Sequence, residues 1–214
     1  MFKTIKEDVE AEIVEKKSKF IANIYYVQSI DEAENYLNSI RKKHYDAKHH
    51  CYAYSIMTED GVVNRFSDDG EPSGTAGAPM LNILNKNNLV NIIVIVTRYF
   101  GGILLGTGGL VKAYSESTLK AIENAELVEE ERGYEARTEI AYNDFEKFKF
   151  YCTNNKINII ETIYNDKIVC TLEVDKQQKE YLLNNINNFN FKLAKIEIIR
   201  EKNIRKKHWN INEK

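Results

Sequence analysis

The chain has 214 residues, of which 43% are hydrophobic and 29% charged, and its formal net charge is −2. This is the composition of a globular protein with one or two domains. No apolar run approaches the roughly 20 residues of a membrane span, and charges begin at Lys3, which is unlike a secretory signal peptide. We therefore expect a cytoplasmic protein without a membrane partner.

Cysteine usage argues against two further classes of protein. The three cysteines form no C-x-x-C pair, and their number is odd, which disfavours a disulfide framework and a cysteine-rich zinc site. They are Cys51, Cys152 and Cys170. We interpret them as small buried hydrophobic residues and expect neither a metal nor a cofactor.

The net charge conceals an asymmetry along the chain. Residues 1–130 hold 14 Lys and Arg against 19 Asp and Glu, whereas residues 131–214 hold 16 against 13. The basic residues of the second part gather in "REKNIRKKHWN", beside Trp209. Such a cluster can meet phosphate groups, but a solubilising basic tail over residues 205–214 is the simpler interpretation.

The first part of the chain predicts alternating strands and helices. Ser29 and Glu32 form a candidate capping box, and the stripe Val111, Tyr114, Thr118, Ile122 and Ala125 predicts one face of a helix. The expected strands cover 18–27, 49–57, 62–67 and 91–100, and the expected helices follow Ser29 and cover 78–87 and 110–125.

The second part predicts the order β-α-β-β-α-β. The expected strands cover 136–142, 157–164, 168–174 and 193–201, with helices capped by Asn143 and Asp175. Leu182, Ile186 and Phe189 would line the inner face of the second helix. This is the ferredoxin-like plan, so we predict an α+β protein with domains at 1–132 and 133–204. The segment "EEERGYEAR" would be the charged connector between them.

Two glycine-rich loops precede predicted helices. In "RYFGGILLGTGGLVKAY", the amides of Gly108 and Gly109, with Arg98 and Lys112, would form a cationic pocket of phosphate size. The segment matches neither a P-loop nor a dinucleotide-binding fingerprint. The alternative is that these glycines form tight turns that let a helix and a strand pack closely.

The other loop, "SDDGEPSGTAGAPM", contains acids and hydroxyls. Ser73 and Thr75 are candidate contacts for an anion, with Asp69 and Glu71 as polar support. The acids, with Asp68, also have the chemistry to hold Mg²⁺, but turn formation explains them more simply. His49, at the start of the strand expected over 49–57, is a further candidate for an anion contact, with a structural role as the alternative.

Four segments of the chain resemble the signatures of the IMPACT/YigZ family. They are "KSKF" (17–20), "HHCYAY" (49–54), "DDGEPSGTAGAP" (68–79) and "RYFGGILLGTGGLVKAY" (98–114). The resemblance implies a first domain like domain IV of translational GTPases and a second like the C-terminal domain of elongation factor G. It also implies a link to translation without an established reaction, so no catalytic residue is transferred.

Three functions follow as hypotheses. The first is a translation-linked regulatory protein that binds RNA or the ribosome through the glycine loops. The second is an enzyme acting on a phosphorylated small molecule, because one polar cluster is larger than turns require. Its members are His49, Asp69, Glu71, Ser73, Thr75 and Arg98. The third is a protein-interaction module whose loops only shape a surface. We favour the first, without catalysis.

Overall fold

A computed structural model describes residues 1–205, and these form two compact units that meet between Glu129 and Glu130. We call Phe2–Glu129 the N-terminal unit and Glu130–Arg205 the C-terminal unit, and describe each by itself. The boundary lies inside one strand, as does our predicted boundary between residues 132 and 133. Across the described residues, no helix has the length and apolar character needed to cross a membrane.

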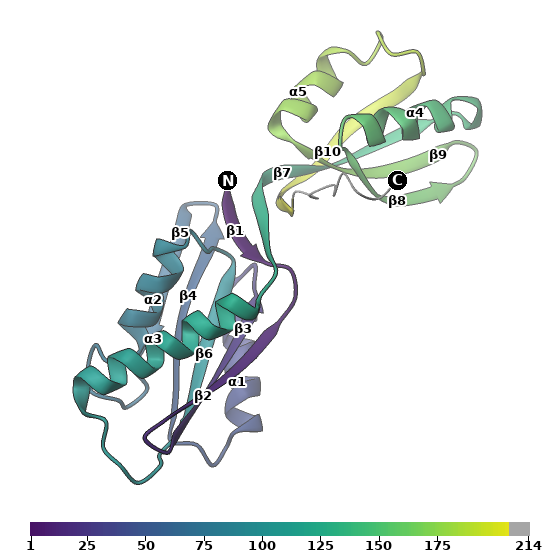
Figure 1. Ribbon diagram of the computed structural model, residues 1–214. Helices are drawn as coiled ribbons and strands as arrows, with labels where there is room; N and C mark the ends of the chain where they lie inside the picture. Colours follow the sequence, from purple (N-terminus) through teal and green to yellow (C-terminus); the bar gives the residue numbers. More distant parts are fainter. Residues whose placement is uncertain (206–214) are drawn as a thin grey trace. The chain divides into compact units, whose positions relative to one another are not determined.

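The N-terminal unit is built on an antiparallel sheet in the order β2-β3-β6-β4-β5 (Figure 1). Its strands are β2 (Val9–Glu15), β3 (Ser18–Tyr26), β4 (His49–Thr58), β5 (Gly61–Ser67) and β6 (Ile92–Tyr99). Its helices are α1 (Ile30–Lys43), α2 (Gly77–Lys86) and α3 (Gly106–Asn124). A short β1 (Phe2–Ile5) precedes them.

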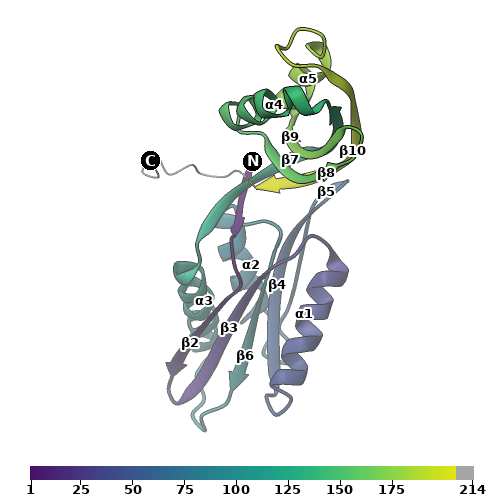
Figure 2. The same ribbon diagram turned by 90° about the vertical axis from the view of Figure 1, so that its right-hand side faces the viewer.

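Both faces of this sheet are covered, which explains the unbroken apolar run of β6. Ile92, Val94 and Val96 belong to the core under α2 and α3. Ile93 and Ile95 belong to the core under α1. Figure 2 shows α1 and α3 on opposite sides of the sheet. By this alternation, the next residue of even number, Arg98, points to the α2 and α3 side.

Several predictions for this unit need correction. Strands β1 and β2 were not predicted, because Lys and Glu on the solvent side of a half-exposed strand resemble a charged terminus. Helix α3 begins at Gly106, so Gly108 and Gly109 lie in its first turn instead of a preceding loop. Val111 is 37% exposed, and Leu110 and Ala113 are buried in its place.

The C-terminal unit has the sheet order β10-β7-β9-β8 with antiparallel neighbours, which is the ferredoxin-like arrangement. Its elements are β7 (Leu127–Ile140), α4 (Tyr142–Asn154), β8 (Asn158–Tyr164), β9 (Ile168–Asp175), α5 (Lys176–Asn184) and β10 (Leu193–Arg205). Phe148, Cys170 and Leu172 form the centre of its core. The predicted α+β fold with two domains is therefore confirmed.

Details of this unit also differ from the predictions. The expected connector is part of the continuous strand β7, and the N-cap of α4 is Ala141 instead of Asn143. The predicted cap Asp175 is confirmed as half of a capping box with Gln178. Helix α5 ends before Ile186 and Phe189, which still pack against the core from the following turns.

The basic end of the chain is only partly described. Strand β10 reaches Arg205, which opens the predicted tail, and residues 206–214 lie outside the described residues. Two of its cations are paired with acids of the sheet. Arg200 donates to Glu135 at 2.9 Å, and Lys202 to Glu173 at 2.6 Å.

Candidate anion-binding site

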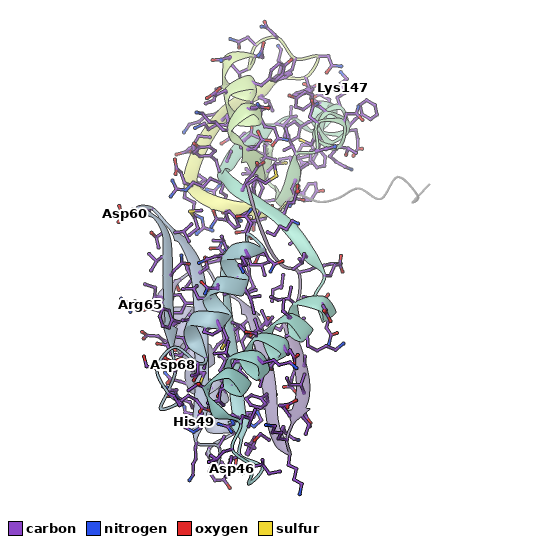
Figure 3. All side chains as sticks on the ribbon, turned by 60° about the vertical axis from the view of Figure 1, so that its left-hand side comes forward. Asp46, His49, Asp60, Arg65, Asp68 and Lys147 are labelled. Atoms are coloured by element: carbon purple, nitrogen blue, oxygen red, sulfur yellow. The ribbon has the colours of Figure 1, made fainter. Side chains whose placement is uncertain are left out.

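Three strands bring the candidate residues to one end of the N-terminal sheet. Arg98 on β6 pairs with Phe20 of β3 on one side and with His49 of β4 on the other. His49 and Asp68 lie toward this end, whereas Asp60 lies at the opposite end, in the β4–β5 turn (Figure 3). The loop 68–76 and the loop 100–105 also begin here.

Arg98 is the buried centre of this end. Its side chain is 7% exposed and donates from Nη1 to Oε1 of Glu71 at 2.7 Å, and from Nη2 to Oγ of Ser18 at 3.5 Å. The guanidinium lies 5.5 Å from the ring centroid of Phe20 and 5.6 Å from that of Phe100. Its charge is thus neutralised by the protein itself.

Glu71 joins three elements. Its Oε1 also accepts a hydrogen bond from the hydroxyl of Tyr114 on α3 at 2.8 Å. Burial raises the pKa of Tyr114, so the phenol stays protonated and acts as the donor. The ring of Tyr114 packs edge-on against Phe20 with centroids 5.2 Å apart. The loop acid predicted as polar support therefore links the loop to β6 and α3.

Asp68 occupies the start of α2. Its carboxylate accepts from the backbone N–H groups of Gly74, Ala76 and Gly77 at 2.8, 3.0 and 2.8 Å. The N–H groups of Ala76 and Gly77 are donors that a helix leaves without intrahelical partners, and the negative charge is favourable at this end of the dipole. Helix α2 is therefore capped by an acid of its own loop.

Asp69 turns to the other side of the sheet. Its backbone has a left-handed φ of 42°, and its carboxylate accepts from Arg41 at 3.1 Å and from the backbone N–H of His50 at 2.7 Å. Nδ1 of His49 lies 2.9 Å from the carbonyl oxygen of Asp69, so this nitrogen carries the proton. His49 thus supports the loop directly.

A second polar cluster, under α1, was not predicted. The hydroxyl of Tyr99 donates to Asp46 at 2.9 Å and accepts from Nδ1 of His44 at 3.0 Å. His50 donates from Nε2 to the carbonyl of His44 at 3.1 Å. Burial is the largest cause that lowers the pKa of both histidines. Nε2 of His44 is buried without a hydrogen-bond partner, which also disfavours its protonation.

The first turn of α3 contrasts with that of α2. Gly106, Thr107 and Gly108 are exposed, and no side chain in the described part of the chain caps this turn. A Cβ on Gly108 would meet nothing within 4 Å, so packing does not require glycine there. A Cβ on Gly109 would lie 3.0 Å from Cβ of Leu105. Lys112, in the second turn of α3, has a side chain that is 70% exposed.

The loop before α3 rests on the β2–β3 turn. A Cβ on Gly101 would lie 2.0 Å from the carbonyl carbon of Lys17, and the Gly101 N–H donates to Oγ of Ser18 at 3.1 Å. Lys16 and Lys17 form this turn with φ values of 44° and 66°, and both are exposed. Two lysines therefore lie beside the loop that leads into α3.

The remaining candidates differ in accessibility. Ser73 is exposed, whereas Thr75 is buried and donates its hydroxyl to the carbonyl of Pro72 at 2.6 Å. The structure thus joins Arg98 to Glu71, and His49 to Asp69, within the fold. It leaves Ser73, Gly108 and Lys112 at the surface.

Sequence reasoning missed Tyr114 as the partner of Glu71 and Asp68 as the cap of α2. A spacing pattern contains no signal for contacts so distant along the chain. It also missed Lys16 and Lys17, for which a two-residue turn between alternating strands was the available signal.

The described residues offer little for a metal or a thiol reaction. They include no group of three or more His, Cys, Asp or Glu side chains arranged to hold a metal ion. Cys51, Cys152 and Cys170 are buried and unpaired, as predicted. Burial raises the pKa of Cys51 to about 12, so its thiol stays protonated and donates to the carbonyl of Asp68 at 2.9 Å.

Comparison with known proteins agrees with this architecture. The family model of the Impact N-terminal domain matches residues 16–122, and that of a domain of unknown function, DUF1949, matches residues 138–189. A crystal structure described as that of a hypothetical protein has a TM-score of 0.63 and 30% identity, covering 92% of this chain and 97% of that one.

Two curated relatives carry the family name. IMPACT family member YigZ of Escherichia coli is 46% identical over 50% of this chain and 53% of its own. IMPACT family member YvyE of Bacillus subtilis is 36% identical over 82% of this chain and 80% of its own. With both domain models matched in order, the chain belongs to the IMPACT family.

Proposed function

We propose that this chain is a translation-linked regulatory protein that binds RNA or the ribosome at the first turn of α3. The observation that carries the proposal is the uncapped, exposed turn of Gly106, Thr107 and Gly108. Free amides at a helix start attract phosphate groups, both as donors and through the helix dipole. Glycine at position 108 costs helix stability without a packing return, which suits close approach by a ligand.

Charge beside this turn supports the same proposal. Lys16, Lys17 and Lys112 are exposed, and Lys112 pairs with Glu116 at 3.6 Å. Surface pairs of this kind are weak, so the ammonium groups remain open to phosphate. The signature resemblance supplies the translational setting. The acidic balance of residues 1–130 predicts local contact instead of a broad electrostatic surface.

The buried acids and Arg98 fit the alternative enzyme less well. Arg98 and Glu71 are paired with each other and Thr75 bonds the loop backbone, so they offer little to a phosphorylated substrate, although Nε of Arg98 is buried without a hydrogen-bond partner. The third hypothesis retains one favourable observation, because Phe100, Ile103 and Leu104 are 56%, 42% and 83% exposed in the loop before α3. These side chains would suit a protein partner, or bases in an RNA complex.

The test compares RNA binding of two variants that lose the same charge. The site variant carries Lys16→Asn, Lys17→Gly and Lys112→Gln, and the first two substitutions are those that a two-residue turn prefers. The control carries Lys42→Gln, Lys86→Gln and Lys120→Gln, all at exposed positions.

We expect the site variant to bind RNA or ribosomes more weakly. Its plot of log affinity against log salt should be shallower by about 2, because each lost phosphate contact removes about 0.7–0.9 from the slope. If the site variant had the same salt slope as the control variant, the proposed site would be refuted. Partners that survive nuclease treatment and depend on Phe100 or Leu104 would favour the protein-interaction hypothesis.

A further inference from the structure

The C-terminal unit has an open groove of about 490 Å³ along the outer side of α4. Helix α4 buries Phe145, Phe148 and Cys152 against the sheet, so the groove is formed by the helix surface that the sheet does not cover and by the segment after α5. Its lining residues are Glu146, Lys147, Phe150, Tyr151, Asn154, Asn155 and Asn190.

Tyr151, which lines the groove, belongs to an aromatic cluster. Tyr151 lies 5.0 Å from the ring centroid of Phe189 and 5.4 Å from that of Phe191, and these two rings are stacked at 4.9 Å. Phe150, next to Tyr151 in the chain and also part of the groove lining, is 70% exposed. It presents a large apolar ring to solvent.

Two amides in the groove are available for recognition. Asn155 donates to the carbonyl of Tyr151 at 2.9 Å, whereas the side chains of Asn154 and Asn190 have no hydrogen-bond partner within residues 1–205. A carboxamide offers one donor and one acceptor side by side. The Watson–Crick and Hoogsteen edges of unpaired bases present the complementary pattern.

The charged side chains in and beside the groove carry a small positive excess. Lys147 pairs with Asp144 at 3.4 Å, and Lys149 pairs with Glu146 at 3.0 Å. Asp144 also accepts from the backbone N–H of Lys192 at 3.2 Å, which brings a further cation to the first turn of α4. Because exposed ion pairs are weak, Lys147, which is 56% exposed, remains open to a phosphate group.

We propose that this groove binds an unpaired nucleotide of single-stranded RNA. The base stacks on Phe150, the amides of Asn154 and Asn190 bond its edge, and Lys147 meets the adjacent phosphate. The site lies in the other unit from the proposed α3 site and does not depend on it.

The sheet of the same unit is poorly suited to this task. In ferredoxin-like RNA-binding domains, aromatic residues on the sheet stack the bases. Here Glu135, Arg137 and Glu173 alternate with the buried Ala136, Thr138 and Leu172, so they lie on the face away from the core. Phe150 and the unpaired amides are on α4 and the α5–β10 segment instead.

The direct test is NMR of the full, ¹⁵N-labelled chain titrated with ten-residue oligouridylate and oligoadenylate. The side-chain NH₂ signals of Asn154 and Asn190 should shift with either RNA, and should not shift with a blunt RNA duplex. Because these signals report on the groove alone, they should also shift in the Lys16→Asn/Lys17→Gly/Lys112→Gln variant. Unmoved signals at saturating single strand, or equal shifts with duplex, would overturn the proposal.

The affinity of Phe150 variants for single-stranded RNA distinguishes base stacking from a general apolar contact. Phe150→Ala and Phe150→Leu should each weaken binding about tenfold, because stacking on an aromatic ring is lost in both. Phe150→Tyr should bind like the original chain, and so should Tyr45→Ala, which removes an 85% exposed ring elsewhere. If Phe150→Leu retained full affinity, an apolar protein contact would explain the groove and the nucleotide proposal would fail.

Discussion

Arg98 and Glu71 form an ion pair with a 2.7 Å contact, although their side chains are only 7% and 4% exposed. The pair connects the end of strand β6 to a loop residue 27 positions earlier in the chain. The hydroxyl of Tyr114 completes it from α3. Because a charge buried without its partner is costly, this contact holds the loop in place more firmly than turn chemistry alone.

The first prediction concerns this pair. Glu71→Ala should lower the free energy of unfolding by about 3–5 kcal/mol, because it leaves the guanidinium of Arg98 buried and unpaired. Urea denaturation monitored by circular dichroism measures the change. Glu123→Ala, at a 67% exposed position paired with Lys120 at 3.8 Å, should change it by less than about 1 kcal/mol. Similar values for the two variants would contradict the role of Glu71.

The second prediction concerns the cap of α2. Asp68→Ala should lower the free energy of unfolding by about 2–3 kcal/mol, because three backbone N–H groups lose their shared acceptor. Asp60→Ala is the matched control, since Asp60 lies exposed in the β4–β5 turn (Figure 3). Urea denaturation monitored by circular dichroism measures both changes. A loss for Asp68→Ala no larger than for its control would show that α2 does not need this carboxylate.

Much of the fold could be predicted from short-range patterns of apolar and polar residues. The apolar run of β6 predicts a strand covered on both faces, and the alternation around Cys170 predicts a half-buried one. Strands rich in charged residues and the first residues of helices are harder to predict from the sequence. Gly106 and Thr107 contain no apolar periodicity, so the start of α3 was placed too late.

The contacts of the two loops could not be predicted from the sequence. The motifs single out both loops, but Asp68 and Asp69 are neighbours whose carboxylates bond different helices. The two carboxylates point in different directions because Asp69 has a left-handed φ, which the sequence pattern does not specify. Likewise, Arg98 resembles a phosphate ligand in the sequence, because its partner Glu71 is identified only by the folded structure.

The third prediction separates two glycines of the same motif. Gly108→Ala should raise the free energy of unfolding by about 0.5–1 kcal/mol, because the position is helical and a methyl group meets open space. Gly101→Ala should lower it, since its Cβ would overlap the backbone of Lys17. Thermal unfolding measures both. A destabilised Gly108→Ala would contradict the open first turn of α3.

The same variant also tests the proposed function. If phosphate groups approach the amides of α3, the methyl group of Gly108→Ala should weaken RNA binding while the fold becomes more stable. Leu119→Ala, a 41% exposed position further along α3, should leave binding unchanged. Equal RNA affinity for Gly108→Ala and the original chain would argue against contact at these amides.

The last prediction concerns pH and the cluster under α1. Burial keeps His44 and His50 neutral and lowers the pKa of each, whereas histidine in an unfolded chain titrates near about 6.5. The unfolded chain therefore binds more protons below that pH, so the free energy of unfolding should fall as the pH drops from about 7 to 5.5. Urea denaturation across this range should show a shallower decline for His44→Gln/His50→Gln. Equal slopes for the two proteins would mean that neither imidazole is held neutral by the fold.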